Sequence, residues 1–93
     1  MLDLSHNQLS GEIPPAIITL TELSQLKLNN NSLAGQMIRD IGALANLSKL
    51  SLSRNQVTGS VPKSLSNLRI RLLNLNHNRL SGSLPKFDEW TSL

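Results

Sequence analysis

The chain of 93 residues contains no cysteine and no tyrosine, and it has one tryptophan and one phenylalanine. The lack of cysteine excludes disulfides and thiolate metal ligands, and two histidines alone cannot complete a zinc site. With so few aromatic rings, nucleic-acid bases would have no surface to stack on, so we expect no nucleic acid partner. No run of about 20 apolar residues is present, so we expect no direct membrane insertion by this segment and no membrane span.

What the chain does contain is a thirteen-residue phrase, Leu-x-Leu-x-x-Asn-x-Leu-x-Gly-x-Ile-Pro, which recurs four times. Its asparagine and its glycine return after 24, 24 and 23 residues. A constant period of this length predicts a solenoid, in which each coil buries its apolar side against its neighbours. We expect coils at about residues 1–24, 25–48, 49–71 and 72–93, as one segment of a larger domain.

Each part of the phrase has a physical role. The two leucines of Leu-x-Leu share one face of a short strand, so stacked coils would form a parallel sheet. The asparagine follows at a turn, where its amide can both donate to and accept from the main chain of neighbouring coils. Beyond the proline the apolar spacing changes from two to three, which is typical of a 3₁₀ turn. The predicted structural turn residues are Asn7, Asn31, Asn55 and Asn78.

With Leu-Ser-Gly-Glu-Ile-Pro at Leu9 to Pro14 and Leu-Ser-Gly-Ser-Leu-Pro at Leu80 to Pro85, the chain resembles the plant-specific class of leucine-rich repeats over its full length. The second coil departs from the pattern, with Ala34 for the usual serine and Ile38 for the proline. The resemblance implies a leucine-rich-repeat solenoid of the α/β class, with a strand and 3₁₀ turns in each of about four coils. It also implies a short parallel sheet on the concave face.

The family occurs in ectodomains of plant receptor-like kinases and receptor-like proteins, and in secreted polygalacturonase-inhibiting proteins. The resemblance therefore implies recognition without catalysis, with a peptide or protein ligand, a co-receptor ectodomain as a further partner, and no cofactor. We interpret the chain as a fragment of a receptor ectodomain, extracellular or at the plasma membrane in its parent, which could carry a separate kinase domain. A secreted inhibitor or defence protein is the alternative. The ends of the chain lack a signal peptide and the cysteine-bearing caps usual in the family.

The strand face is the candidate recognition surface, because its side chains project from a rigid sheet and align from coil to coil. We read four columns across the coils: Asp3/Lys27/Ser51/Asn74, Ser5/Asn29/Ser53/Asn76, His6/Asn30/Arg54/His77 and Gln8/Ser32/Gln56/Arg79. The predicted ligand-binding residues are His6, Lys27, Asn30, Arg54 and His77. The competing interpretation is that these polar positions are simply solvated.

Charge is uneven along the chain. No Asp or Glu lies between residues 41 and 87, and the basic residues of that stretch are Lys49, Arg54, Lys63, Arg69, Arg71, Arg79 and Lys86. The excess of basic residues is compatible with an anionic partner, such as a peptide carboxylate or an acidic polysaccharide. Because only Arg54 and Arg79 are expected on the strand face or its edge, a generally basic surface is favoured.

The sequence also contains three short motifs, one Arg-x-Arg and two Asn-x-Ser. Arg69-Ile70-Arg71 has the letters of the Arg-x-Arg pair with which some receptors of this family hold a ligand carboxylate. In the family's register those arginines flank the first strand leucine, and Leu72 and Asn74 hold these places here, so we expect no clamp. Two Asn-x-Ser sequons make Asn46 and Asn30 possible N-glycosylation sites. No nucleophile, base and orienting group fall together, so we predict no catalytic residue.

Overall fold

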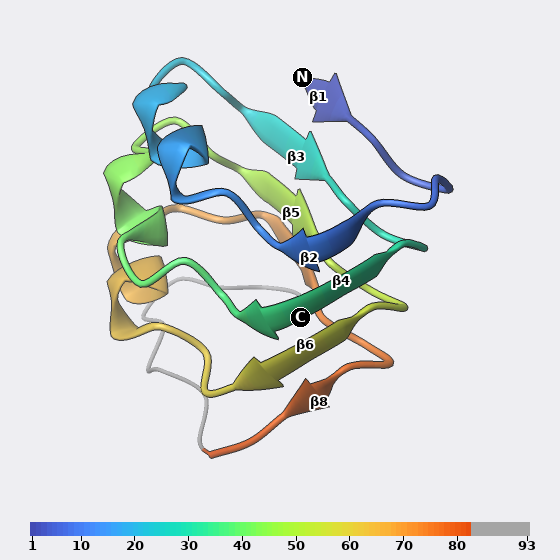
Figure 1. The fold of residues 1–93 in the computed structure, drawn as a ribbon. Coiled ribbons are helices and arrows are strands. Elements are labelled where there is room, and N and C mark those ends of the chain that lie inside the picture. The colour runs from blue at the N-terminus through green and yellow to red at the C-terminus, as the bar shows by residue number, and fades with distance from the viewer. Residues whose placement is uncertain (83–93) are drawn as a thin grey trace.

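The computed structural model describes residues 1–82, which wind into coils stacked side by side (Figure 1). One parallel sheet contains, in spatial order, β1 (Leu2–Asp3), β3 (Gln25–Lys27), β5 (Lys49–Ser51) and β7 (Leu72–Asn74). A second parallel sheet contains β2 (Ser10–Glu12), β4 (Ser32–Gln36), β6 (Gln56–Gly59) and β8 (Arg79–Leu80). Three 3₁₀ helices connect the sheets on the convex side: η1 (Pro15–Thr19), η2 (Ile41–Ala43) and η3 (Lys63–Asn67). The predicted solenoid of strands and 3₁₀ turns is confirmed.

The first sheet keeps the repeat in register. Leu2 pairs with Leu26, Leu26 with Leu50 and Leu50 with Leu73, so the same position of the phrase meets itself in every coil. Three of these leucines are buried, with exposed fractions of 1–2%. Because side chains alternate along a strand, burying the leucines turns the residues between them outward. This sheet is therefore the strand face that the sequence predicts.

The second sheet was not predicted from the sequence. β2 begins three residues after its turn asparagine, and β4, β6 and β8 begin directly after theirs. Gly11 pairs with Leu33, and Gly35 pairs with Val57. The pairing thus advances by 22 residues where the first sheet advances by 24. Gly35 holds φ at +75°, and a Cβ on it would lie 2.7 Å from Cγ of Glu12 in the preceding coil. A left-handed backbone and a close neighbour both favour glycine there.

The convex side differs in the second coil, where Ile38 replaces the proline. Pro14 and Pro62 fix φ near −60° and lead directly into the five-residue helices η1 and η3, whereas η2 has three residues and starts after Asp40. Ser64 connects this coil to the next, since its Oγ donates to the Arg39 carbonyl at 2.8 Å and accepts the Gly42 N–H at 3.1 Å. The departure from the repeat shortens the helix and leaves the stacking intact.

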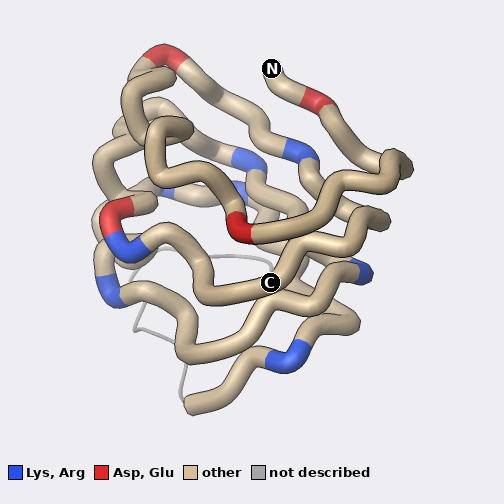
Figure 2. The backbone as a smooth tube through the Cα atoms, in the orientation of Figure 1, with Lys and Arg blue, Asp and Glu red and all other residues tan. Residues whose placement is uncertain are grey.

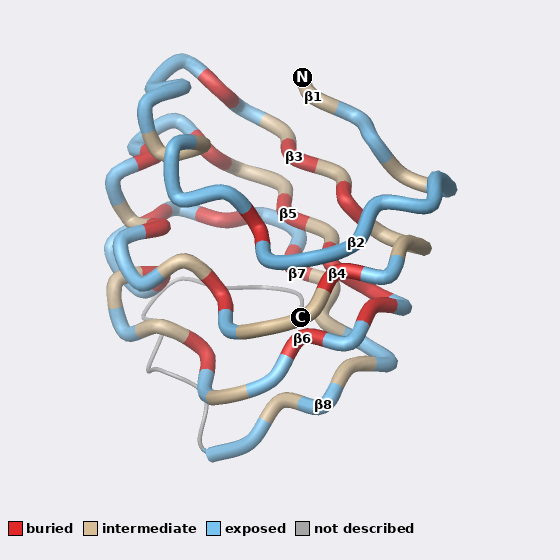
Figure 3. The backbone as a smooth tube through the Cα atoms, in the orientation of Figure 1, coloured by how far each residue is buried: buried red, intermediate tan, exposed pale blue. Residues whose placement is uncertain are grey.

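The core is aliphatic and runs along the stack. Its members, in the described part of the chain, are Ile13, Leu23, Leu26, Leu28, Leu33, Met37, Ile41, Leu44, Leu47, Leu50, Leu52, Val57, Val61, Leu65, Leu68, Ile70 and Leu73. Burial increases from the first coil inward (Figure 3). The end of the predicted fourth coil, from residue 83, lies outside the described residues.

Candidate recognition surface

The middle column of the strand face is aligned by backbone pairing. Asp3 pairs with Lys27, Lys27 with Ser51 and Ser51 with Asn74. Lys27, Ser51 and Asn74 are half-buried. Because the sheet packs on the aliphatic core, its polar side chains are held in fixed positions, which suits them to bind a partner.

A further column of the strand face was missed in the sequence. Gln25 pairs with Lys49 and Lys49 with Leu72, so these residues stand one position before the first strand leucine, on the same face as the middle column. Among the basic residues between 41 and 87, expecting only Arg54 and Arg79 on this face or its edge was therefore wrong, because Lys49 in β5 pairs with the outward-facing Gln25. The alternation itself gives the signal, since residues on either side of a buried leucine face the same way. Leu72 adds an apolar side chain that is 46% exposed.

The column of His6, Asn30, Arg54 and His77 stands at the edge of the strand face, where the chain leaves the first sheet. All four residues have a left-handed backbone, with φ between 57° and 59°. Asn and His tolerate this conformation better than most residues, so part of the column's composition has a backbone cause. His6, Arg54 and His77 are exposed, and Asn30 is half-buried, where its Oδ1 accepts a hydrogen bond from Asn29 Nδ2 at 2.9 Å.

The fourth column belongs elsewhere. Ser32 and Arg79 open β4 and β8, and Gln56 opens β6, so these three residues lie in the second sheet. Assigning Ser32, Gln56 and Arg79 to the strand face was wrong, because the turn at the asparagine redirects the chain before this position, whereas Gln8 lies between β1 and β2 and belongs to neither strand. Arg79 therefore does not contribute its charge to the strand face.

The turn asparagines join each coil to the one before it. Oδ1 of Asn31, Asn55 and Asn78 accepts the backbone N–H of Leu9, Leu33 and Val57, respectively, at 3.0–3.1 Å. Their Nδ2 groups donate to the carbonyls of Leu4, Leu28 and Leu52 at 2.8–3.0 Å. In residues 1–82 no buried side-chain nitrogen or oxygen lacks a hydrogen-bond partner. Each residue of the column His6, Asn30, Arg54 and His77 directly precedes a turn asparagine. The hydrogen bonds of Asn31, Asn55 and Asn78 therefore fix the backbone next to Asn30, Arg54 and His77.

Charge on this surface is positive toward the middle coils. Lys27 and Lys49 lie on adjacent strands of the same face, two residues apart in register, and Arg54 stands at its edge. Asp3 is the acidic residue of the middle column; hydrogen bonds from Ser5 Oγ and Ser5 N–H lower its pKa, and the charge of Lys27 adds to this effect. Figure 2 shows that the other basic positions are spread around the coils.

The remaining motifs lie off the strand face. Arg69 and Arg71 fall between η3 and β7 and flank Ile70, which is buried. Lys49 pairs with Leu72 and Ser51 with Asn74, so the places beside the first strand leucine are held by Leu72 and Asn74. Asn46 is exposed on the convex side, with Nδ2 3.4 Å from the Thr21 carbonyl oxygen.

Two structural features are absent from the described part of the chain. Among residues 1–82, no three His, Cys, Asp or Glu side chains gather closely enough to hold a metal ion. None of the helices in this part is long and apolar enough to cross a membrane.

Comparison with known proteins identifies a common family. The sequence profile described as Leucine Rich Repeat matches residues 1–20, 46–68 and 69–88. Among curated protein sequences, no significant match was found. Many solved structures match, among them the following three from Arabidopsis.

The first is the Arabidopsis receptor kinase HAESA, solved in complex with the peptide hormone IDA and the co-receptor SERK1. It is 48% identical with a TM-score of 0.86, and the match covers 90% of this chain and 14% of that chain. The BIR3–SERK2 complex from Arabidopsis thaliana gives 42% identity and a TM-score of 0.85, covering 89% of this chain and 45% of that chain. The ectodomain of the receptor kinase SOBIR1 from Arabidopsis thaliana gives 39% identity and 0.83, covering 87% and 45%. The chain thus spans less than half the length of each.

Proposed function

Because the chain belongs to the leucine-rich-repeat family, we propose that it is a non-catalytic recognition scaffold of the receptor-kinase ectodomain type. Its strand face binds a peptide or a protein, and a co-receptor ectodomain is a further partner. In its parent protein the scaffold lies on the extracellular side, where Asn46 is open to glycosylation. The similar structures are receptor ectodomains, two of them in complexes, which favours this function over a secreted inhibitor.

One observation carries the proposal: the outward residues of the first sheet, which are polar apart from Leu72, are held in register by a ladder of buried leucines. A ligand lying across the coils meets donors and acceptors whose spacing is set by the sheet and does not need to be ordered on binding. The residues assigned to it are His6, Lys27, Asn30, Arg54 and His77, and the structure adds Gln25, Lys49 and Leu72 to the same face.

The positive charge of this face selects among ligands. Lys27, Lys49 and Arg54 favour a partner that presents carboxylates, and complementary charge chiefly raises the association rate and restricts the choice of partner. Leu72 offers an apolar contact beside them. We therefore expect peptides that combine acidic groups with an apolar side chain to bind best.

A peptide display library panned on the full chain tests the proposal. The selected peptides should bind the double variant Lys27→Glu and Arg54→Glu at least about tenfold more weakly, which corresponds to roughly 1.4 kcal/mol. The matched control is Lys63→Glu with Arg69→Glu, which makes the same change of net charge at exposed convex positions and should leave binding nearly unchanged. Equal losses for both pairs would reduce the effect to bulk charge and contradict the proposal. Peptides that bind all three proteins equally would also contradict it.

A further inference from the structure

A groove lies on the outside of the stack, at the corner where the second sheet leads into the convex helices. This lateral groove has a volume of about 570 Å³, and its lining comes from the second sheet and the convex segments. Its apolar part contains Pro15 and Ile18 from η1 and Ile38 from the segment before η2. Its polar part contains Glu12, Gln36, Arg39, Asp40 and Thr58.

The lateral groove follows from the irregular second coil. Pro14 and Pro62 each lead directly into a five-residue helix, whereas Ile38 is followed by two non-helical residues, Arg39 and Asp40. The short helix η2 packs against η3 and makes little contact with η1. Ile38 also supplies a backbone N–H, which proline lacks, and in the described part of the chain this N–H makes no backbone hydrogen bond.

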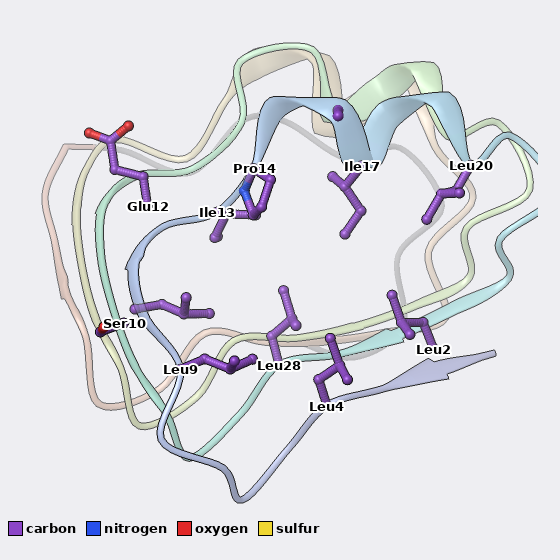
Figure 4. A pocket seen from close by; sticks show the side chains of 12 residues that line it. Leu2, Leu4, Leu9, Ser10, Glu12, Ile13, Pro14, Ile17, Leu20 and Leu28 are labelled. Atoms are coloured by element: carbon purple, nitrogen blue, oxygen red, sulfur yellow. The ribbon is translucent and has the colours of Figure 1, made fainter.

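Glu12 forms the wall of the lateral groove on the side of the second sheet. Figure 4 shows its side chain pointing outward from the first coil, while the neighbouring Ile13 points inward. The Glu12 side chain reaches the next coil, because its Cγ would lie 2.7 Å from a Cβ placed on Gly35. The missing side chain of Gly35 therefore leaves room for Glu12 to lie over the second coil, beside the groove.

The polar groups of the lateral groove are available to a ligand. In the described part of the chain, Glu12, Arg39 and Asp40 make no ion pair and no side-chain hydrogen bond. The Gln36 amide and the Thr58 hydroxyl make no side-chain hydrogen bond there either. All five side chains are exposed, so water satisfies them in the free protein and a ligand can take the place of that water.

The lateral groove is acidic on a chain that is basic as a whole. The described residues contain four side-chain carboxylates, those of Asp3, Glu12, Glu22 and Asp40. Two of them line the groove, and Arg39 is the one basic residue of its lining. The groove therefore favours a cationic group, although the whole chain carries a net charge of +3. The strand face, with Lys27 and Lys49, has the opposite preference.

We propose that the lateral groove is a second binding surface, which takes an extended segment of a partner protein with an arginine or lysine next to an aliphatic side chain. The basic group pairs with the carboxylates of Glu12 and Asp40. The aliphatic side chain packs between Ile18 and Ile38, and the backbone of the segment bonds with the Gln36 amide and the Ile38 N–H. The strand face stays free for the ligand proposed above.

Two other occupants fit the lateral groove less well. An acidic segment could reach Arg39, but its charge would lie near two carboxylates, and like charges in contact disfavour binding. A purely apolar ligand would pack on Ile18 and remove water from the polar groups without replacing their hydrogen bonds. A basic group beside an aliphatic one satisfies both parts of the lining.

A display library of short peptides, each with one fixed arginine among randomised positions, tests the proposal on the 93-residue chain. Selected peptides should carry an aliphatic residue beside the arginine. They should bind the groove variant, Glu12→Gln with Asp40→Asn, at least about tenfold more weakly. The matched control, Asp3→Asn with Glu22→Gln, makes the same change of net charge at exposed positions outside the groove and should leave binding nearly unchanged. Equal losses for the two pairs, or a library without binders, would overturn the proposal.

Ile38→Pro tests the shape of the lateral groove. It restores the residue that Pro14 and Pro62 hold in the neighbouring coils, and it removes both the side chain and the N–H that the segment would contact. The variant should keep its thermal midpoint and bind the selected peptides at least about fivefold more weakly. Undiminished binding would contradict the proposal. If the midpoint falls, Ile18→Ser on the opposite wall takes its place, with the same expected loss.

Arg39→Gln and methyl NMR distinguish the other occupants. Arg39→Gln should leave binding unchanged or tighten it, whereas a loss would assign the groove to an acidic segment. On titration with a selected peptide, the methyl resonances of Ile18 and Ile38 should shift; a shift confined to Leu72 would place the peptide on the strand face and refute the proposal. In sedimentation, a dimer of the natural chain that the groove variant abolishes would identify a second copy as the occupant instead.

Discussion

The first and the third coil carry the same phrase in different surroundings. Leu4 is 38% exposed, whereas its counterpart Leu52 is 2% exposed. Asn7 is exposed and bonds only within its own coil, whereas Asn55 is buried and bonds to two coils. The same residue at the same repeat position therefore contributes differently to the free energy of unfolding in different coils, because each coil is stabilised mainly by the neighbours that cover it.

The largest difference should appear in the leucines. Leu52→Ala should lower the free energy of unfolding by roughly 2–5 kcal/mol, because it opens a cavity between two coils. Leu4→Ala removes a side chain that is already partly exposed and should cost less than about 1 kcal/mol. Urea denaturation of both variants measures the comparison. Equal losses of unfolding free energy would mean that Leu4 is as deeply buried in solution as Leu52.

The turn asparagines should differ next. Asn55→Ala should cost roughly 1–3 kcal/mol, because the Leu33 N–H and the Leu28 carbonyl would lose their partner inside the stack. Asn7→Ala should cost less, since water can replace its bonds. Asn67 on the convex side is exposed and provides a second control, with an expected change within about 0.5 kcal/mol. Thermal melts of the three variants decide the order, and a larger loss at Asn67 would contradict the assigned phase.

The left-handed column provides a smaller effect of opposite sign. Arg54 holds φ at 57°, which asparagine adopts at lower cost, so Arg54→Asn should stabilise the chain by about 0.5 kcal/mol. The same change removes a charge from the recognition surface, so selected acidic peptides should bind more weakly. Calorimetry and peptide titration on one variant separate the two effects. Loss of stability would show that the Arg54 side chain supports the fold.

The smallest effect concerns pH at Asp3. Hydrogen bonds from Ser5 lower the pKa of this carboxyl in the folded chain, so its contribution to stability is present above the unfolded value of about 3.9. That contribution is lost as the pH falls through the lower, folded value. Thermal midpoints of the natural chain and Asp3→Asn should therefore converge in acid and differ slightly at neutral pH. The third coil has Ser51 at this place, so Ser51→Asn should show no such pH dependence.

The sequence predicted the first sheet and the convex turns because both carry a periodic apolar signal. Leu26 and Leu50 alternate with polar residues, and Ile41 and Leu44 stand three apart. The apolar spacing alone therefore predicts a strand and a 3₁₀ turn, and all four residues are buried. The second sheet carries no such signal. Ser10–Glu12 is exposed throughout and is a strand only because its backbone pairs with β4. Pairing between coils is a tertiary effect that a local pattern does not contain.

The candidate surface was predicted in part for the same reason. Lys27 follows from the alternation, and the same rule applied one residue earlier in each coil would have found Lys49. The left-handed φ of His6 and Arg54 depends on the turn geometry, and the placement of Arg79 depends on the second sheet. These features arise from how one coil meets the next, which becomes visible only when the coils are stacked.

The two sheets advance unequally along the stack. In the first sheet a straight line across the strands meets the same position of the repeat in each coil, as in Leu2, Leu26 and Leu50. In the second sheet such a line passes from Glu12 to Ala34 to Gln56, so it meets a residue two positions earlier in the repeat at each coil, a displacement of roughly 7 Å at about 3.3 Å per residue. A partner lying across the first sheet therefore meets columns of equivalent residues, whereas a partner lying across the second sheet would meet a different repeat position in every coil. Repeating one residue type at one position of the phrase builds a uniform row only on the first sheet.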